Sequence, residues 1–232
     1  MDPLTLGAPA LDPARAVVPQ LAHILREAII RNRLPPGTRL TETEIGKAMG
    51  VSRQPVREAF IKLSEEGFLD IRPQRGTFVR PICLDRLLDA RFLREALEAD
   101  VVRLCAECRP PGLGAELRRQ IAGQRALGAG SSAEFLPLDN LFHRSLAEAV
   151  GRGQAWDMAA GLNRQMDRIR HLSVTHFPVG TLVDQHEAIA EAVEVGDAAT
   201  AETLMRAHLR LVLEELPAIR EAVPHAFEGS PG

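Results

Sequence analysis

The feature that most constrains the fold of this chain is a change in the spacing of its apolar residues. Within the first eighty residues, helical spacing gives way to short runs typical of strands. Apolar residues recur at helical spacing over residues 18–34, and the Pro-Pro-Gly sequence at 35–37 ends the helix that this spacing predicts. Thr41 and Glu44 form a capping-box pattern, which predicts a second, short helix that ends near Gly50. The chain is therefore expected to begin with closely spaced short helices.

A third helix and a hairpin follow this pair. Ser52 is expected to cap the third helix, which runs to Gly67. Short β-branched and aromatic runs at 68–71 and 77–79 are separated by turn-forming residues, which predicts two paired strands. Three helices and a hairpin within about sixty residues predict a winged helix-turn-helix over residues 17–81.

The remainder of the chain shows only helical spacing, broken by stretches that contain Gly or Pro. Residues 82–222 are therefore predicted to form an antiparallel all-α helical bundle, and the fold class is mainly α. Residues 1–16 lack the basic start and compact apolar run of a signal peptide and are expected to form a flexible arm, with a tail at 223–232. The predicted bundle helices lie at about 84–108, 114–128, 134–150, 154–176, 182–195 and 198–221.

The charge is divided unevenly along the chain. Residues 1–80 hold 12 Lys and Arg against 9 Asp and Glu, whereas residues 81–232 hold 16 against 22. A basic segment joined to an acidic one is expected where only the first part contacts nucleic-acid phosphates. No stretch approaches the roughly 18–20 apolar residues of a membrane helix, so no membrane association is expected.

Because the chain has three cysteines, they cannot all pair in disulfides within it, which favours a reducing, cytoplasmic location. Cys105 and Cys108 form a Cys-x-x-Cys pair inside a predicted helix, and no second pair accompanies them. We therefore expect these two residues to pack in the structure, and we favour that role over a metal or redox site.

The third predicted helix separates an apolar face from a polar one. Val56 and Phe60 recur at helical spacing and are expected to point inward, whereas Arg53, Gln54 and Arg57 project from the outer face and the helix start. Arg can form two hydrogen bonds to the major-groove edge of guanine, and Gln can do the same for adenine. This helix is therefore predicted to read double-stranded DNA.

Neighbouring positions suit contacts to the DNA backbone and the adjacent groove. Ser52 and the amides of the helix start suit a phosphate, and Thr43 near the start of the second helix is a further candidate for phosphate contact. Gln74, Arg75 and Gly76 form the expected hairpin tip, which is small and basic enough to enter a minor groove. For any one of the arginines Arg53, Arg57 and Arg75 taken alone, the alternative is that it belongs to a solvent-exposed face without a role in DNA binding.

The run LPPGTRLTETEIGKAMGVSRQPVREAFIKLSEEGFLDIRPQRGTFV resembles the N-terminal domain of GntR-family regulators. The resemblance rests on PPG, then GVSR-x-PVREA, then L-x-x-EGF, and on a wing that ends in GTFV, across almost 50 residues. It implies a homodimer on a short palindromic operator. The residues that it implies as DNA readers are Ser52, Arg53, Gln54, Arg57, Arg75 and Gly76.

The second half carries polar residues on faces that should be apolar. Asp139 and His143 are four residues apart and share a helical face with apolar neighbours, while His186 and His208 each lie in register with an apolar stripe. A single histidine in such a place is usually a hydrogen-bonded core residue. Burial of four such groups is costly unless one partner satisfies them together, and a divalent cation such as Zn²⁺, Ni²⁺ or Mn²⁺ would do so.

The same four residues match the pattern of the FCD (FadR-like) subgroup of GntR regulators, which resembles D-x-x-x-H followed by two later histidines. The segment from Arg94 to Glu98 also resembles the R-x-x-x-E signature of this subgroup. The resemblance implies that Arg94 points into a cavity and binds an effector carboxylate or phosphate, with an ion pair to Glu98 as an equally weighted alternative. Arg168 and Arg170 are weaker candidates for effector contacts.

These features predict a DNA-binding transcription regulator, and most readily a repressor, that releases its operator when a small organic acid binds at the metal. One alternative is a metal-dependent hydrolase with an appended DNA-binding module, since a metal with an open position can activate water. No obvious general base accompanies the metal ligands, which favours a regulator over a hydrolase. No catalytic residues are therefore predicted. A further alternative is a metal-responsive regulator, in which the metal ion itself, and not an organic acid, controls DNA binding.

Overall fold

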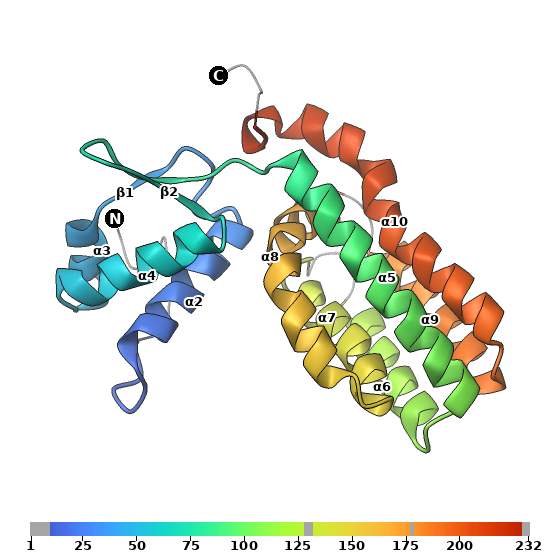
Figure 1. Cartoon of the computed structure of the whole chain (residues 1–232). Helices are drawn as coiled ribbons and strands as arrows, with labels where there is room; N and C mark the ends of the chain where they lie inside the picture. The colour runs from blue at the N-terminus through green and yellow to red at the C-terminus, as the bar shows by residue number, and fades with distance from the viewer. Residues whose placement is uncertain (1–9, 128–131, 177–178, 229–232) are drawn as a thin grey trace. The chain divides into compact units, whose positions relative to one another are not determined.

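The computed structural model describes residues 10–127, 132–176 and 179–228, and these form two compact units (Figure 1). One unit comprises the chain up to Leu84 together with the segment from Val223 onward, and the other comprises Asp85–Ala222. Residues 1–9 of the expected arm, the break at 128–131 and the last residues of the expected tail lie outside the described residues.

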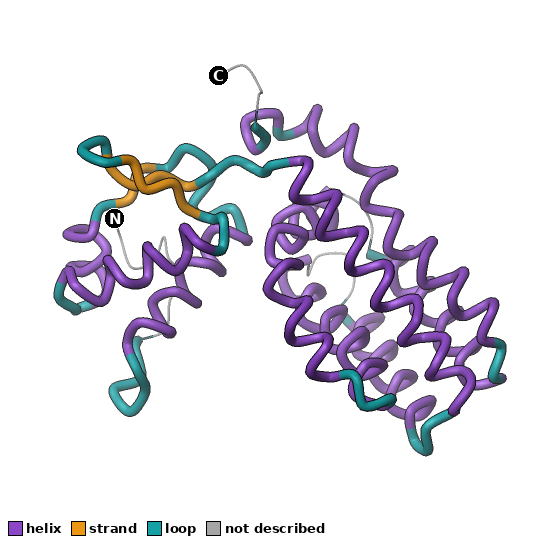
Figure 2. The backbone as a smooth tube through the Cα atoms, viewed as in Figure 1, coloured by secondary structure: helices purple, strands orange, loops and turns teal. Residues whose placement is uncertain are grey.

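The first unit combines helices with a small antiparallel sheet, as predicted (Figure 2). The strand order is β1-β3-β2, and the β2–β3 register pairs Leu69 with Val79 and Arg72 with Gly76. The strand β1 was not predicted, because two residues carry no detectable alternation and depend on β3 for their pairing. The elements are α2 (Val17–Ile30), β1 (Arg39–Leu40), α3 (Glu42–Met49), α4 (Arg53–Glu65), β2 (Leu69–Arg72) and β3 (Gly76–Val79).

The turn between α3 and α4 depends on local backbone chemistry. Thr41 Oγ1 accepts the Glu44 amide at 3.2 Å, as the capping pattern predicted, and Gly50 ends α3 with a φ of 68°. A Cβ on Gly46 would lie 2.9 Å from the Val51 carbonyl oxygen, so the tight turn requires glycine there. Ser52 occupies the N-cap position of α4, as predicted, although its hydroxyl makes no capping hydrogen bond.

The core of this unit lies between α2 and α4 and beneath the sheet. Val56, Phe60 and Leu63 are buried, as their spacing predicted. Arg26 on α2 donates two hydrogen bonds to the carboxylate of Glu66, at 2.7 and 2.8 Å, which ties α2 to the end of α4. The outer face of α4 is therefore presented by a rigid, packed support.

The end of the chain returns to the first unit. After a short 3₁₀ turn, η1 (Pro224–Ala226), the Ile82 amide donates to the Ala226 carbonyl at 2.7 Å and the Glu228 amide donates to the Ile82 carbonyl at 3.0 Å. Ile82, Ala226 and Phe227 are buried. The expected tail therefore includes residues that pair with the linker directly after the wing.

The described residues of the second unit form helices only. The consecutive helices α6 and α7, α7 and α8, and α9 and α10 pack as antiparallel neighbours, and α6 also packs against α9. None of the described helices combines the length and apolarity needed to cross a membrane. The helices are α5 (Leu84–Cys108), α6 (Leu113–Ala126), α7 (Ser132–Ala149), α8 (Gly153–His176), α9 (Gly180–Val195) and α10 (Ala198–Ala222).

A carboxylate on α5 links that helix to α10. Glu95 accepts hydrogen bonds from Arg210 Nε at 3.0 Å and Arg206 Nη1 at 3.2 Å, and it also contacts Arg91. The hydrogen bond from Arg210 is the largest of the effects that lower the pKa of Glu95, which falls to about 2. Because folding lowers this pKa, the stabilisation is fully present above about pH 4.5 and is lost as the pH falls toward 2.

Glu95→Gln is therefore expected to lower the free energy of unfolding at pH 7 by about 1–2 kcal/mol, since two of the arginine partners are solvent-accessible and screened. The difference from the parent protein should shrink toward zero near pH 2. Urea unfolding of the metal-free chain at several pH values measures both effects, with Asp89→Asn, an exposed position on the same helix, as the control. An equal deficit at pH 7 and pH 2 would contradict this account of Glu95.

Candidate metal centre and DNA-contacting surface

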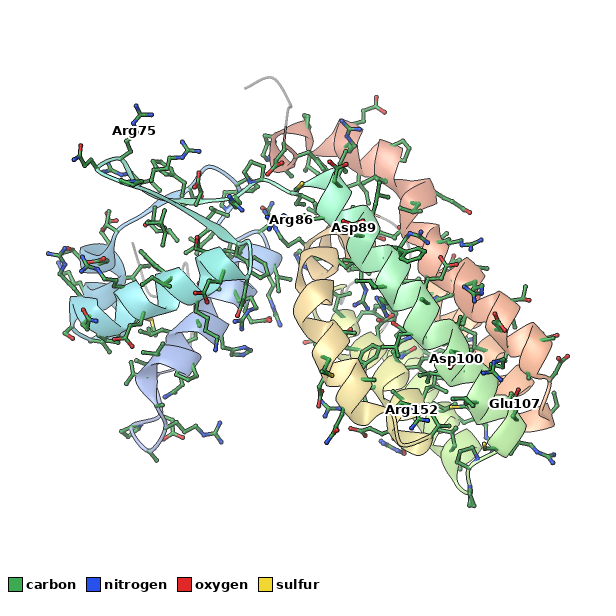
Figure 3. The ribbon with its side chains drawn as sticks, in the orientation of Figure 1. Arg75, Arg86, Asp89, Asp100, Glu107 and Arg152 are labelled. Carbon is green, nitrogen blue, oxygen red and sulfur yellow. The ribbon has the colours of Figure 1, made fainter. Side chains whose placement is uncertain are left out.

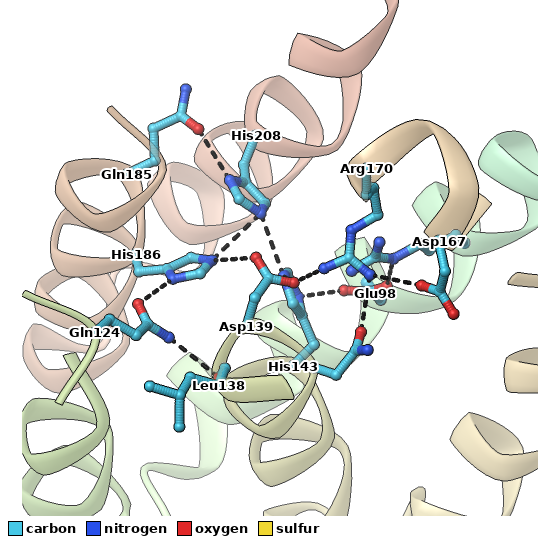
Figure 4. Close-up of polar contacts among 12 residues, drawn as sticks. Glu98, Gln124, Leu138, Asp139, His143, Asp167, Arg170, Gln185, His186 and His208 are labelled. Atoms are coloured by element: carbon cyan, nitrogen blue, oxygen red, sulfur yellow. Dashed lines mark hydrogen bonds and ion pairs between the residues drawn. The ribbon is translucent and has the colours of Figure 1, made fainter. Parts of the chain in front are cut away.

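Three helices bring the four predicted metal ligands together inside the second unit (Figure 4). Asp139 and His143 lie one turn apart on α7, His186 lies on α9 and His208 on α10. All four side chains are buried, and their potential ligand atoms lie within 4.8 Å of one another. Side chains that are far apart in sequence therefore converge on one point.

The imidazoles meet through their Nε2 atoms. His208 Nε2 lies 3.2 Å from His143 Nε2 and 3.3 Å from His186 Nε2. The Asp139 carboxylate closes the group, with Oδ1 3.5 Å from His186 Nε2 and Oδ2 3.7 Å from His143 Nε2. Nitrogen and carboxylate ligands in this number suit a divalent transition metal.

The other ring nitrogen of each histidine faces an oxygen acceptor. Glu98 Oε2 lies 2.5 Å from His143 Nδ1, Gln124 Oε1 lies 2.8 Å from His186 Nδ1, and Gln185 Oε1 lies 2.9 Å from His208 Nδ1. The orientation of the Gln124 amide is set by its donation to the Leu138 carbonyl at 3.2 Å. Oxygen atoms on α5, α6 and α9 therefore face all three Nδ1 atoms, which favours the tautomer that carries its proton on Nδ1.

This tautomer has a direct electrostatic consequence. With a proton on each Nδ1, three Nε2 lone pairs and a carboxylate face one another among buried side chains, which is unfavourable without a cation. Burial lowers the pKa values of His143, His186 and His208, so the rings stay neutral and retain the lone pairs that a metal requires. The donor set therefore fits a divalent cation.

Arg94 and Glu98 adjoin the metal ligands. Arg94 Nε donates to Glu98 Oε1, so the i,i+4 ion pair is present, and Arg94 also lines the pocket beside Asp139 and His208. Burial raises the pKa of Glu98, but the charge of Arg94 and the hydrogen bond from His143 outweigh this effect and lower it to about 2. Arg94 Nη2 is buried and has no hydrogen-bond partner among the described residues, so it remains available to a ligand.

The other two candidate arginines differ in position. Arg170 lines the same pocket, contacts Asp139 Oδ2, and donates to Asn140 Oδ1 at 2.8 Å and to Asp167 Oδ1 at 3.0 Å. Arg168 is buried, but it does not belong to the described lining of this pocket. The structure therefore places Arg170, and not Arg168, beside the candidate metal ligands.

The cysteines take no part in this centre. Cys105 is buried, as predicted, and its thiol lies 3.2 Å from the Leu146 carbonyl, whereas Cys108 is exposed, so the packing role predicted for Cys108 is wrong. Burial raises the pKa of Cys105 to about 12, so its thiol stays protonated and is a poor metal ligand. All three cysteines are free.

The exposed face of α4 carries the predicted base-contacting residues. Arg53 and Arg57 both pair with Glu42 on α3, with N–O distances of 3.2 and 2.8 Å. The two arginine side chains remain 67% and 59% exposed, so these pairs hold them over the surface without burying them. The hydrogen bond from Arg57 is the main cause of the lowered pKa of Glu42.

The remaining predicted DNA contacts are also accessible. Thr43, Ser52 and Gln54 are exposed, and Gln54 Nε2 donates to Glu58 Oε1 at 3.0 Å. Arg75 extends from the β2–β3 turn into solvent (Figure 3), and Gln74 before it adopts a φ of 59°. Gly76 after them adopts a φ of 112°, and a Cβ there would lie 3.0 Å from Arg39 Nε of the same unit.

Sequence comparisons match two family models to these two units. Residues 18–79 match the model for bacterial regulatory proteins of the gntR family, and residues 89–211 match the FCD domain. The HTH-type transcriptional repressor RspR of Escherichia coli K12 is 36% identical over 213 residues, which cover 91% of this chain and 93% of that protein.

The chain belongs to the GntR family, in its FCD subgroup.

Solved structures agree with this membership. A putative GntR transcriptional regulator from Rhodococcus sp. RHA1 superposes with a TM-score of 0.71 at 26% identity, covering 87% of this chain and 98% of that one. E. coli McbR/YncC shares the fold with a TM-score of 0.72 at 19% identity, covering 90% of this chain and 99% of that one. As a member of this family, the chain is a DNA-binding transcription regulator and not an enzyme.

Several residues around the sites of this GntR regulator were not predicted from the sequence. Glu42, Gln124 and Gln185 were missed, and Glu98 was considered only as a partner of Arg94. Gln124 did carry a signal, since it continues the buried spacing of Leu117 and Ile121 on α6. The same reasoning that singled out the histidines, a polar residue at an apolar position, would have found it.

Proposed function

We propose that this GntR regulator is a repressor whose affinity for operator DNA is controlled by a small organic acid bound at a metal site in the FCD domain. The metal ligands in this proposal are Asp139, His143, His186 and His208. The observation that carries it is the convergence of three Nε2 atoms whose Nδ1 partners are already engaged. RspR and the probable D-xylose utilization operon repressor of Paenarthrobacter nicotinovorans, which is 29% identical, are both named as repressors.

The effector would bind where the metal ligands and Arg94 meet. A divalent ion such as Zn²⁺, Ni²⁺ or Mn²⁺ would supply a Lewis-acidic point for a carboxylate oxygen. Arg94 offers Nη2, which is buried and unpartnered among the described residues, as a donor to the same carboxylate. Arg170, which is held by Asp139, Asn140 and Asp167, would supply positive charge at the pocket wall.

The DNA-contacting residues in this proposal follow from their exposure on α3, α4 and the wing. Arg53, Gln54 and Arg57 would read base edges in the major groove, and Arg75 would reach the minor groove. Exposed basic and polar groups over a rigid core support this assignment. The further contacts proposed are Thr43 and Ser52 to phosphate, with Gln74 and Gly76 at the wing tip.

A homodimer on a palindromic operator completes the proposal. Leu88, Phe92 and Leu93 form an exposed apolar stripe on α5, and Phe92 is 63% exposed. Exposed apolar surface of this kind is typical of protein–protein interfaces. In the dimer, the α4 helix of each copy would bind one half-site of the operator. An effector that binds more tightly to a dimer whose α4 helices do not fit both half-sites would release the DNA.

The test measures DNA binding with and without organic acids. A duplex selected by this protein from a random library is titrated with Zn²⁺-loaded chain, and short-chain carboxylates and sugar acids are added in turn. At least one acid is expected to lower the operator affinity by about 5–150-fold, which corresponds to a coupling of about 1–3 kcal/mol. Arg94→Lys, which keeps the charge but removes the two-pronged donor, should weaken this response.

Two results would overturn the proposal in distinguishable ways. If chelation alone releases the operator and no acid has an effect on the loaded protein, the metal itself is the signal. If neither chelation nor any acid changes operator affinity, the FCD site does not control DNA binding.

A further inference from the structure

The pocket next to the candidate metal ligands has a second polar end. Its lining runs from Asp139 and His208 to Ser173 on α8 and Glu215 on α10. The walls between these ends are mostly aliphatic. They include Leu136, Met166, Val174, Leu209, Leu211 and Val212.

Ser173 and Glu215 form a pair across two helices. The Ser173 hydroxyl, which is buried, donates to Glu215 Oε2. Burial is the main cause of a raised pKa for Glu215, and the neighbouring charge of Glu214 adds to it. Among the described residues, no Lys, Arg or His side chain lies within ion-pair distance of Glu215. The Glu215 carboxyl group therefore has no positively charged protein partner there.

The helix geometry sets the distance between the two ends. His208 and Glu215 are seven residues apart on α10, so they lie on one face about 10.5 Å apart along the helix axis. Leu211 and Val212 lie between them and line the pocket. After allowance for the metal–ligand bonds and one hydrogen bond, this spacing fits a chain of roughly four to six atoms.

We propose that Ser173 and Glu215 form a specificity site that selects an effector with a hydroxyl or ammonium group at the end opposite its carboxylate. This inference rests on the proposed function, because it takes the carboxylate end to lie at the metal and Arg94. Glu215 accepts a hydrogen bond from the distal donor, and Ser173 holds the Glu215 carboxyl group in place. The aliphatic wall packs against the methylene groups between the two ends.

The Glu215 carboxyl group would also weaken the binding of acids that lack a hydrogen-bond donor at the far end. A dicarboxylate would place its second negative charge next to Glu215, and a simple fatty acid would leave the Ser173–Glu215 pair facing a methyl group. Glu215 lies beyond residues 89–211, where the FCD domain matches, so the FCD pattern does not account for it.

Calorimetric titration of the Zn²⁺-loaded full chain tests the proposal with four five-carbon acids that differ only at the far end. The acids are 5-hydroxypentanoate, 5-aminopentanoate, glutarate and pentanoate. The first two are expected to bind about ten- to hundredfold more tightly than glutarate and pentanoate. Glu215→Gln should remove most of the advantage of 5-aminopentanoate over glutarate, and Glu215→Arg should reverse their order.

Glu221→Gln provides the matched control, since Glu221 is exposed on the same helix, lies outside the described pocket lining and should leave all four affinities unchanged. Ser173→Ala should weaken the hydroxy and amino acids while leaving pentanoate unchanged. Equal or tighter binding of glutarate by the parent protein, or an unchanged ranking in Glu215→Gln, overturns the specificity site alone. Binding of none of the four acids to the loaded protein overturns both this site and the carboxylate site at the metal.

Discussion

Replacing His186 with alanine is expected to abolish stoichiometric metal binding by the full chain. His186 Nε2 lies 3.3 Å from His208 Nε2 and 3.5 Å from Asp139 Oδ1, so its removal takes away one of four converging ligands. Loss of an outer hydrogen-bond partner of a metal ligand typically costs 10–100-fold in affinity, so loss of the ligand itself should cost more than about a hundredfold. Competition with a chromophoric zinc chelator measures the change.

The controls separate loss of the metal site from loss of the fold. His23→Ala replaces an exposed histidine on α2 and should retain full metal content. Helical circular dichroism of His186→Ala should resemble that of the metal-free parent protein. If the variant keeps one tightly bound metal per chain, the cation does not lie among these four residues.

Replacing Arg57 with alanine is expected to lower specific operator affinity by roughly ten- to a hundredfold per half-site, since a two-pronged contact to guanine contributes about 1–3 kcal/mol. The side chain is 59% exposed and pairs only with Glu42 among the described residues, so the fold should be unaffected. Fluorescence anisotropy with the selected duplex measures the loss. A second selection with the variant should show relaxed preference at one base pair in each half-site.

Lys62→Ala on the same helix is the matched control for Arg57. Lys62 is also exposed, but it lies two turns away from the start of α4, where the base contacts are proposed. Its removal should reduce affinity modestly and equally on all sequences. Equal operator affinity for Arg57→Ala and the parent protein would remove α4 as the reading helix.

The sequence predicted the helices well because their ends carry strong local signals. Gly50, Gly151 and Gly196 each adopt a positive φ at or next to a helix end, and Thr41 caps α3 as its spacing indicated. Two other features escaped prediction because they depend on distant partners. The strand β1 needs β3, and the position of Phe227 depends on Ile82, which is 145 positions earlier.

The candidate metal centre was predictable only in part. The spacing of Asp139 and His143 places them on one face of α7, but nothing in that spacing brings α9 and α10 to the same point. That expectation came from the cost of burying four polar groups without a common partner, and from the resemblance to FCD regulators. The glutamine acceptors and the unpartnered Nη2 of Arg94 required coordinates, since a hydrogen bond between helices depends on their packing and not on local sequence.

X-ray absorption at the metal edge of the purified, metal-loaded chain tests the central claim most directly. The account predicts three imidazole nitrogens and a carboxylate oxygen at about 2.0–2.2 Å, with the imidazole scattering reduced in His186→Ala. Sulfur scattering at about 2.3 Å, which would place the metal at cysteine, or a spectrum unchanged by His186→Ala, would contradict it.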